Sequence, residues 1–456
     1  MPWRYLVLAF CTAFAAFAGH GWMMVVTLCG LFRFTQHGSG KERAAKALLW
    51  GALYAGGYHL WLLRSDWVLW CLGWPYRVGI WLLLLTPPLA LRRMLPTRLW
   101  SEWTESLAWA CGLALVTWAQ LLTPWGFDWE APLAALTTEP WTLSLLPWLG
   151  LVGLSAVVGL GCALIAGSRA TVRLAGFALL AVWLGLSRLV FASAADGFSP
   201  SWPVIGLVQT GWPQELKWAK ENQSAAKLRL IEMTHRAAQG GADLIIWPET
   251  AWPVVSLLGQ PHEQQAVSSL AREQKVTVVV SSLESEGSAW RNTVSQVSPE
   301  GEFEARYHKR RLVPLVEDAL WGFARSRRFL SGDAASVFVH GGLRYAPLVC
   351  YESTVPWLCQ DLADQVDFFA VVTNDATLGS EFAKEAHFRS AILRAIECRR
   401  PVLQASNDGV SGVVDARGVV RQRSRRGVAE AALLLVDVQD LARKRKSLPD
   451  GDHSTL

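Results

Sequence analysis

The sequence predicts a polytopic α-helical membrane domain followed by an α/β domain. The chain of 456 residues is 52% hydrophobic and only 18% charged, which is too apolar for an ordinary soluble protein of this length. Long apolar runs follow one another from Tyr5 to Phe191, whereas charged residues, alternating strands and amphipathic helices appear from Trp202 onward. We therefore expect a transmembrane domain in residues 1–195 and a globular domain in residues 200–440.

Seven apolar runs approach the length of about 20 residues that a helix needs to cross a bilayer. These runs are residues 4–19, 20–34, 45–63, 67–91, 105–122, 141–167 and 172–192. The first two are short, so they are also compatible with one hairpin that dips into the bilayer. Tryptophans cluster at the ends of the runs, where amphipathic rings favour the membrane interface. We expect about seven crossings.

Basic residues indicate the orientation of these crossings. Arg33, Lys41, Arg43 and Lys46 follow the second run, Arg92, Arg93 and Arg98 the fourth, and Arg169 and Arg173 the sixth. The intervening linkers contain only Arg64 between the third and fourth runs and no Lys or Arg in residues 123–140. Because basic linkers stay in the cytoplasm, the globular domain is expected outside the membrane. Cleavage of residues 1–19 as a signal peptide would not change this orientation.

The cysteines divide in the same way. Five of the eight, Cys11, Cys29, Cys71, Cys111 and Cys162, fall inside the apolar runs and are expected to be packing residues. Cys350, Cys359 and Cys398 lie in the globular half. An oxidising compartment would favour a disulfide between two of these three, and the sequence leaves open which two.

The globular half alternates strands with helices, which is typical of a layered α/β domain. Strands are expected at residues 204–210, 244–250, 276–284, 345–350, 367–375, 401–408 and 412–418, and helices at 225–239, 263–273 and 386–398. Glu249, Cys350 and the pair Asn374–Asp375 end three of these strands. Ligands usually bind at the carboxyl ends of strands, so we expect these side chains to converge.

A carboxylate, an ammonium group and a thiol together suit acyl transfer. The loop YHKRRLVPLVE supplies Lys309 and Glu317. A thiol becomes a good nucleophile when a base such as Glu249 removes its proton. A neighbouring lysine can then stabilise the thiolate of Cys350 and the oxyanion of a tetrahedral intermediate.

Each of these residues also has a common structural explanation. A buried cysteine is usually unreactive, a strand-end carboxylate such as Glu249 can cap the next segment, and a basic run such as HKRR is usually a solvated face. Glu317 and Glu352 could pair with Arg310 or Arg325. His308 and His387 have no partner at metal-ligand spacing, so we interpret both as structural and expect no metal site.

Several motifs in order resemble one known superfamily. WPET with Glu249, YHKRRLVP with Lys309 and LVCYES with Cys350 are similar to the Glu-Lys-Cys signature of the nitrilase, or carbon–nitrogen hydrolase, superfamily. TNDATLG, HFRSAILRAIECRRP and QASNDGVSGVVDARG resemble the segments that follow the nucleophile in those enzymes. The resemblance implies that the α/β domain is a nitrilase-like αββα sandwich.

The apolar half makes the whole chain similar to the apolipoprotein N-acyltransferase family, a membrane-embedded branch of that superfamily. The resemblance implies that Glu249 is the general base, that Lys309 stabilises charge and that Cys350 is the acylated nucleophile. It further implies supporting roles for Glu317, Tyr351, Glu352 and Trp218, the last in the motif ELKW.

The resemblance also implies a reaction and a location. A phospholipid would acylate Cys350 and leave as a lysophospholipid, and the amine of a diacylglyceryl-cysteine lipoprotein would then take the acyl group. That amine must be neutral to attack, so activity is expected to fall in acid. We expect a monomer in the bacterial inner membrane with the catalytic domain outside, without cofactor or nucleic-acid partner.

Three departures from the family pattern stand out. Residues 313–317 read VPLVE where the family usually has VPFGE, and Thr377 and Leu378 stand where an aromatic residue is usual. Residues 428–456 are too short in apolar length and too charged to form the final membrane helix of typical members. We expect residues 441–456 to be an extracytoplasmic, disordered tail.

Two alternative functions remain open on sequence alone. One is a paralogue of the same family with a dedicated acceptor, as in conjugal-transfer systems. The other is a membrane-anchored nitrilase-like amidase that uses water as its acceptor.

Overall fold

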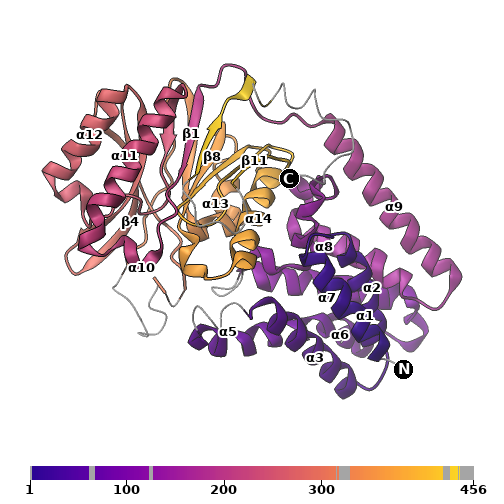
Figure 1. Cartoon of the computed structure of the whole chain (residues 1–456). Helices are drawn as coiled ribbons and strands as arrows, with labels where there is room; N and C mark the ends of the chain where they lie inside the picture. Colours follow the sequence, from indigo (N-terminus) through magenta and orange to yellow (C-terminus); the bar gives the residue numbers. More distant parts are fainter. Residues whose placement is uncertain are drawn as a thin grey trace. The chain divides into compact units, whose positions relative to one another are not determined.

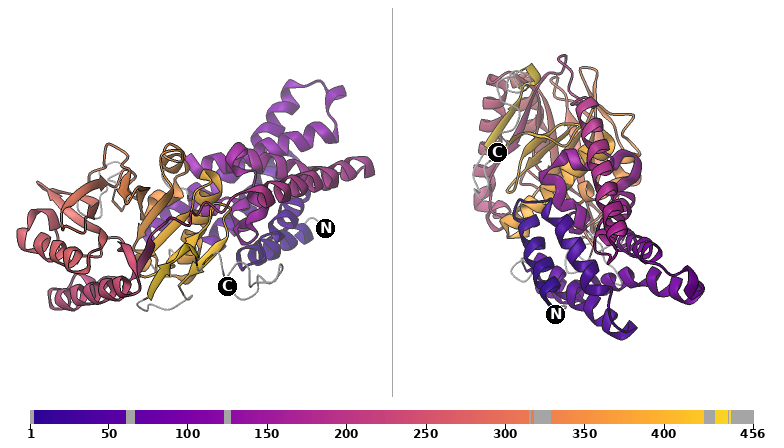
Figure 2. Two further views of the ribbon diagram at one scale, coloured as in Figure 1. Left: turned by 90° about the horizontal axis from the view of Figure 1, so that it is seen from above. Right: turned by 90° about the vertical axis from the view of Figure 1, so that its right-hand side faces the viewer.

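A computed structural model describes residues 3–60, 67–122, 127–314, 316–317, 329–424, 432–439 and 441. The chain divides into two units, Met1–Ala194 and Ala195–Leu456, which we name the helical unit and the sandwich unit (Figures 1 and 2). Each unit has its own buried core and is described by itself.

The helical unit consists of α-helices joined by short 3-10 turns. The α-helices are α1 (Trp3–Phe17), α2 (Met23–Thr35), α3 (Gly40–Tyr58), α5 (Trp67–Ile80), α6 (Thr86–Met94), α7 (Glu102–Leu122), α8 (Leu146–Ile165) and α9 (Ala170–Ser193). The 3-10 turns are η1 (Trp81–Leu85), η2 (Thr97–Leu99), η3 (Asp128–Glu130), η4 (Pro132–Thr138) and η5 (Pro140–Leu143). Among the described residues, α7, α8 and α9 are long and apolar enough to cross a membrane, by length and composition. The count of about seven crossings stays a prediction.

The fourth apolar run differs from the single helix that its composition predicts. The structure divides it into α5, η1 and α6, with Pro75 inside α5 and a proline pair in the first turn of α6. Proline lacks the N–H that continues a helical ladder, and its ring clashes with the preceding turn. Apolar composition alone therefore overestimated the continuity of this segment.

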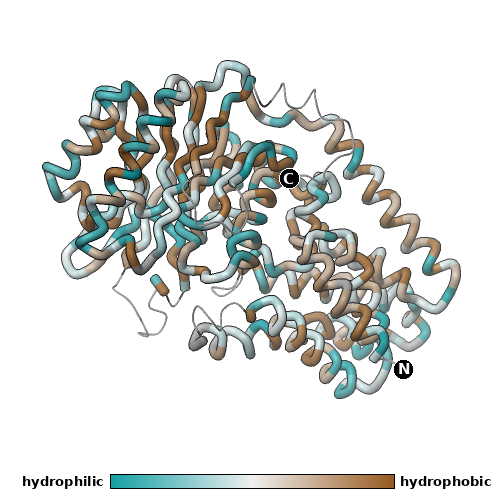
Figure 3. The backbone as a smooth tube through the Cα atoms, viewed as in Figure 1, coloured by the Kyte–Doolittle hydropathy of each residue, from teal (hydrophilic) through white to brown (hydrophobic). Residues whose placement is uncertain are grey.

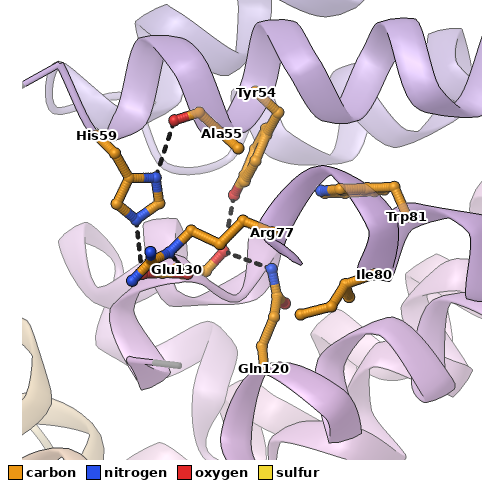
Figure 4. Close-up of a pocket in the computed structure, with 8 residues that line it drawn as sticks. All are labelled: Tyr54, Ala55, His59, Arg77, Ile80, Trp81, Gln120 and Glu130. Atoms are coloured by element: carbon orange, nitrogen blue, oxygen red, sulfur yellow. Dashed lines mark hydrogen bonds and ion pairs between the residues drawn. The ribbon is translucent and has the colours of Figure 1, made fainter. Parts of the chain in front are cut away.

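A buried polar network lies inside the helical unit (Figure 4). Glu130 in η3 is 2% exposed; its carboxylate lies 2.6 Å from Nε2 of His59 and 3.0 Å from Nε of Arg77. Its main-chain carbonyl accepts hydrogen bonds from Tyr54 (3.0 Å) and Gln120 (3.3 Å). These contacts of the carboxylate and the main-chain carbonyl tie the short turn η3 to α3, α5 and α7, so a single residue joins four elements.

The sandwich unit contains two six-stranded sheets. The first has the order β12-β1-β2-β3-β4-β5 and the second β11-β10-β9-β8-β7-β6. The strands are β1 (Val204–Gln209), β2 (Ala242–Ile246), β3 (Thr277–Glu286), β4 (Ala289–Val297), β5 (Phe303–His308), β6 (Phe338–His340), β7 (Leu343–Val349), β8 (Phe368–Thr373), β9 (Val402–Ser406), β10 (Gly412–Val414), β11 (Val420–Arg423) and β12 (Ala432–Val436). Strands β1, β2 and β3 pair in parallel, as do β7, β8 and β9, and the remaining pairs are antiparallel.

Helices cover the outer face of each sheet (Figure 1). They are α10 (Gln214–Lys217), α11 (Gln223–Gln239), α12 (Pro261–Gln274), α13 (Pro356–Gln360) and α14 (Glu381–Cys398), with 3-10 turns η6 (Lys220–Asn222), η7 (Leu257–Gly259), η9 (Cys350–Thr354) and η10 (Asp375–Leu378). Buried residues of α11 and α12 share a core with the outer face of the first sheet. Helix α14 packs on β9 and β10.

The inner faces of the two sheets form a second core. Ile205, Leu244 and Val279 from the first sheet meet Tyr345, Phe368 and Leu403 from the second. In Figure 3 the strands are predominantly apolar, while α11 and α12 alternate apolar and polar residues. This arrangement is an αββα sandwich, so the predicted fold class is confirmed.

The carboxyl-terminal segment contributes an edge strand. Residues 428–456 have too short an apolar stretch to span a membrane, but they contain β12. This strand pairs antiparallel with β1, and Val436 lies opposite Ile205. A strand needs only about five residues to bury one apolar face, far fewer than a membrane helix. Apart from Leu441, the predicted disordered tail lies outside the described residues.

Replacement of Glu130 by glutamine should destabilise the helical unit. Removing one partner of a buried ion pair leaves the other charge uncompensated, which costs about 3–5 kcal/mol. We expect a markedly lower Tm for Glu130→Gln in detergent, measured by the fluorescence of the tryptophans. The control is Glu232→Gln, because Glu232 pairs with Arg236 on an exposed helix face and should contribute less than about 1 kcal/mol. Equal Tm values for the two variants would contradict the prediction.

Candidate active site

Loops at the carboxyl ends of four strands bring the predicted catalytic residues together. Glu249 follows β2 by three residues, whereas Lys309, Cys350 and Asn374 come directly after β5, β7 and β8. The first two strands belong to one sheet and the last two to the other. The site therefore forms at the carboxyl ends of strands from both sheets.

Cys350 occupies a strained position at the start of η9. Its φ of +51° lies in the left-handed region, which a non-glycine residue adopts at an energetic cost. The side chain is half-buried. Burial raises the pKa of the Cys350 thiol well above its usual value, and the carboxylates of Glu249 and Asp375 add to this effect, while Lys309 opposes it. The resting sulfur is consequently a thiol that needs a base.

Glu249 is a buried carboxylate whose charge acts on the Cys350 thiol. Its Oε1 accepts a hydrogen bond from Nδ2 of Asn292 (2.6 Å) and its Oε2 accepts one from the main-chain N–H of Asn374 (3.0 Å). Burial raises the pKa of Glu249, and the Lys309 cation opposes the increase. A carboxylate with a raised pKa accepts a proton more readily, so its basicity suits removal of the thiol proton.

Lys309 is a buried cation between two carboxylates. It is 1% exposed, and its Nζ lies 2.8 Å from Oε2 of Glu317 and 3.8 Å from Oε1 of Glu249. Burial alone would lower the pKa of Lys309, but the two carboxylates raise it above its usual value. Glu317 is itself held by the main-chain N–H of Val313 (2.8 Å). The lysine therefore stays charged beside the thiol.

Glu352 connects the nucleophile turn to the lysine segment. Its Oε2 accepts a hydrogen bond from the N–H of Val349 (2.8 Å), and its Oε1 accepts bonds from the N–H groups of Arg310 (2.7 Å) and Arg311 (3.0 Å). The Tyr307 hydroxyl donates a further bond to Oε1 (2.7 Å). Glu352 thus braces the residues that flank Cys350 and Lys309. The neighbouring Tyr351 is buried as well.

Trp218 lies half-buried at the end of α10, beside a lysine that sequence reasoning missed. Nζ of Lys217 lies 5.6 Å from the centre of the Trp218 ring and donates hydrogen bonds to the carbonyl of Glu249 (3.2 Å) and to the hydroxyl of Thr250 (2.8 Å). Burial lowers the pKa of Lys217 to about 7, and Glu249 opposes the decrease. Thr250 has φ +48°, so Lys217 supports a strained turn next to the base.

Two asparagines were also missed. Asn292 contacts Glu249, and Asn407 donates hydrogen bonds from Nδ2 to Oδ1 of Asn374 (2.8 Å) and to the carbonyl of Trp212 (2.9 Å). Asparagine is depleted in strands, so Asn292 inside a strand-like segment was an available signal.

The remaining predicted residues have structural contacts. Nδ1 of His308 lies 2.9 Å from the Thr293 hydroxyl. His387 is buried, with Nδ1 2.7 Å from Oδ1 of Asp375 and Nε2 3.2 Å from the main-chain carbonyl oxygen of Cys350. All eight cysteines lie within the described residues as free thiols, and Cys359 and Cys398 are both buried.

Comparison with known proteins identifies related sequences. The profile described as carbon–nitrogen hydrolase matches residues 205–445. The chain is 28% identical over 377 residues to an apolipoprotein N-acyltransferase of Pseudomonas syringae pv. tomato, covering 75% of this chain and 72% of that protein. It is 27% identical over 431 residues to an apolipoprotein N-acyltransferase of Azotobacter vinelandii, covering 84% and 80%. A crystal structure of an amidase from Nesterenkonia sp. aligns with a TM-score of 0.41 at 22% identity, covering 55% of this chain and 98% of that one.

The charge of Lys309 should control the pH at which Cys350 reacts. Because the lysine cation opposes the rise of the thiol pKa, Lys309→Met should move the midpoint of Cys350 alkylation by iodoacetamide to higher pH. Mass spectrometry of the peptide that contains Cys350, after reaction at a series of pH values, measures this midpoint. Lys220→Met, at an exposed position, is the matched control and should leave it unchanged. A midpoint that stays constant or falls in Lys309→Met would refute this role.

Proposed function

The chain belongs to the carbon–nitrogen hydrolase family, and we propose that it is a membrane N-acyltransferase. The acyl group would pass from a phospholipid, through a thioester on Cys350, to the N-terminal amine of a diacylglyceryl-cysteine lipoprotein. The observation that carries the proposal is the buried grouping of Glu249 and Lys309 around the strained thiol, in a chain whose described residues also include three long apolar helices. The similarity to apolipoprotein N-acyltransferases over most of the chain supports the choice of substrates.

The first half-reaction acylates Cys350. Glu249 takes the thiol proton, and the sulfur attacks the carbonyl carbon of a phospholipid ester. The Lys309 cation stabilises the oxyanion of the tetrahedral intermediate. When the carbon–oxygen bond breaks, the departing alkoxide takes the proton from Glu249 and leaves as a lysophospholipid. The products are a thioester and a regenerated carboxylate.

The second half-reaction transfers the acyl group to an amine. The neutral α-amine of the lipoprotein attacks the thioester carbon, and Lys309 again stabilises the oxyanion. Glu249 accepts a proton from the attacking amine and returns it to the departing sulfur. The products are an amide and the free thiol, so neither water nor a cofactor is consumed.

The other residues support this chemistry in distinct ways. Glu317 fixes the ammonium group of Lys309, and Glu352 braces the main chain on both sides of the site. We assign Tyr351 to positioning of the nucleophile turn. The ring of Trp218 lies 5.6 Å from the ammonium group of Lys217, which supports the Glu249 turn, so we assign Trp218 to support of that lysine.

We assign residues 1–195 to the bacterial inner membrane and residues 200–440 to its extracytoplasmic side. The basic linkers after the second, fourth and sixth apolar runs support this orientation. A phospholipid donor is available only at a bilayer, so a thiol that accepts an acyl chain must work near the headgroups. We assign the working form as a monomer, because one chain supplies Glu249, Lys309 and Cys350.

The decisive experiment separates the two half-reactions. Full-length protein in mixed micelles is incubated with a fluorescent phospholipid, and a hydroxylamine-sensitive adduct is sought on Cys350. A diacylglyceryl-cysteine peptide is then added. We expect an adduct that Cys350→Ala lacks and that moves to the peptide amine. Absence of an adduct, or release only to water, would refute the acyltransferase; release to water would indicate an amidase-like hydrolase.

Glu249→Gln should slow formation of the thioester by about 100- to 10,000-fold, the usual contribution of a general base. Glutamine keeps the shape of the side chain and one oxygen for the N–H of Asn374, and the amide of Asn292 can turn its Oδ1, which has no hydrogen-bond partner among the described residues, toward the new NH2 group. The single-turnover rate of adduct formation measures this effect. Glu232→Gln, on an exposed face of α11, is the control. A decrease of less than tenfold would exclude Glu249 as the base.

Transfer of the acyl group from the thioester to the peptide amine should become slower as the pH falls. An α-amine has a pKa of about 8, so below that value the fraction of neutral amine falls about tenfold per pH unit. Starting from purified thioester, the rate of amide formation between pH 5 and 8 tests this expectation. A rate independent of pH over that range would contradict attack by the free amine.

A further inference from the structure

A second buried acid–base pair lies next to Cys350, and the proposed reaction does not use it. Asp375 begins η10 after β8 and is 1% exposed, and His387 in α14 is 2% exposed. Oδ1 of Asp375 lies 2.7 Å from Nδ1 of His387. Cys350, Asp375 and His387 each place a side-chain heteroatom within 4.8 Å of the others.

Hydrogen bonds connect this pair to the turn that holds the nucleophile. Nε2 of His387 lies 3.2 Å from the main-chain carbonyl oxygen of Cys350 and 3.1 Å from the hydroxyl of Ser353, which also donates to that carbonyl (3.0 Å). On the other side, the hydroxyl of Thr373 donates to Oδ1 of Asp375 (2.7 Å), and the sulfur of Cys350 lies within 4.8 Å of a carboxylate oxygen of Asp375. The pair therefore lies between the sulfur and the main-chain carbonyl of the same cysteine.

The acceptors around this pair determine how many protons it holds. A carbonyl oxygen can only accept, so the short contact at Cys350 requires a proton on Nε2 of His387. The contact between Nδ1 and Asp375 requires a second proton, which we place on the ring, so that an imidazolium faces the carboxylate of Asp375. The pair then has a net charge of zero.

The surrounding charges make this neutrality relevant to the thiol. Oδ2 of Asp375 is buried and has no hydrogen-bond partner among the described residues, so His387 is the compensating group that contacts this carboxyl. The other charged groups that act on the sulfur are Glu249 and Lys309. On α14 itself, Lys384 is paired with Asp408 and Glu381, and Arg394 with Glu397.

We propose that Asp375 and His387 are positioning residues that share one proton as a net-neutral pair. They hold the main chain of Cys350 in its left-handed conformation, with the sulfur directed toward Glu249 and Lys309. They also prevent Asp375 from placing an uncompensated negative charge beside the sulfur. The inference rests on the proposed role of Cys350 as the nucleophile, but alkylation of that thiol tests it without any acyl substrate.

The main test compares His387→Gln with the double variant Asp375→Asn/His387→Gln. In the single variant Asp375 keeps its charge without a cationic partner, so the midpoint of Cys350 alkylation by iodoacetamide should rise by about one pH unit. In the double variant the charge is absent and the midpoint should return to the wild-type value. Thioester formation should be at least tenfold slower than in the wild type in both variants, because both lose the bond from His387 and leave the Cys350 carbonyl to Ser353 alone. The full-length protein in detergent is used throughout.

A purely structural role predicts a different pattern. His387→Gln would then leave the alkylation midpoint unchanged, or the double variant would have a midpoint further from the wild-type value than that of His387→Gln. Either result overturns the proposal. His235→Gln is the matched control, because His235 makes a comparable contact with Gln274 (2.9 Å) on the surface of α11. It should keep the wild-type profile.

Single variants of Asp375 provide a test that does not depend on replacing the histidine. Asparagine can donate to Nδ1 of His387, which leaves a proton on Nε2 and a neutral pair. Asp375→Asn should therefore keep the wild-type midpoint and form the thioester within about tenfold of the wild-type rate. Asp375→Ala releases the imidazole and should be at least tenfold slower than Asp375→Asn. Equal rates for the two variants, or a shifted midpoint in Asp375→Asn, would also overturn the proposal.

Discussion

The buried ammonium group of Lys309 is the constraint on which the site depends. Transferring an unpaired ammonium group from water into a protein interior costs several kcal/mol, so its partners must be held at short distance. Glu317 and Glu249 supply that compensation at 2.8 and 3.8 Å. The same cation lies beside a thiol whose deprotonation burial opposes. The single charge of Lys309 therefore requires two carboxylates as partners, and it lowers the free energy needed to form the Cys350 thiolate.

The two catalytic turns both contain a left-handed residue, and each is supported by a buried charged group. Cys350 follows β7 with the N–H of the preceding Val349 bound by Glu352, and Thr250 follows Glu249 with its hydroxyl bound by Lys217. Strained backbone persists only when its surroundings determine it strongly. Glu352 and Lys217 thus hold the turns of the proposed nucleophile and base rigidly, and the proposed mechanism assigns no chemical step to either side chain.

The helical unit applies the same principle to a different purpose. Glu130, Arg77 and His59 are buried together, and hydrogen bonds from Tyr54 and Gln120 complete the network. Here the ionic contacts and hydrogen bonds of Glu130 together connect a short 3-10 turn to three helices, and they lie far in sequence from Cys350. In both units, buried charges join segments that are distant in the chain.

The sequence by itself determined the two-part organisation, the αββα class and the candidate residues Glu249, Lys309 and Cys350. Hydropathy and strand-end patterns are local properties, and motifs in a fixed order are readable without a structure. Only the tertiary structure decided that the fourth apolar run divides at its prolines, that residues 432–436 form an edge strand, and that Lys217, Asn292 and the Asp375–His387 pair surround the site. The prolines act locally, whereas the edge strand and the contacts around the site join segments that lie from 12 to 231 residues apart along the chain. The packing of the two sheets brings their strand ends together and so creates the contacts around the site. No local sequence pattern predicts which polar side chain will lie beside Cys350.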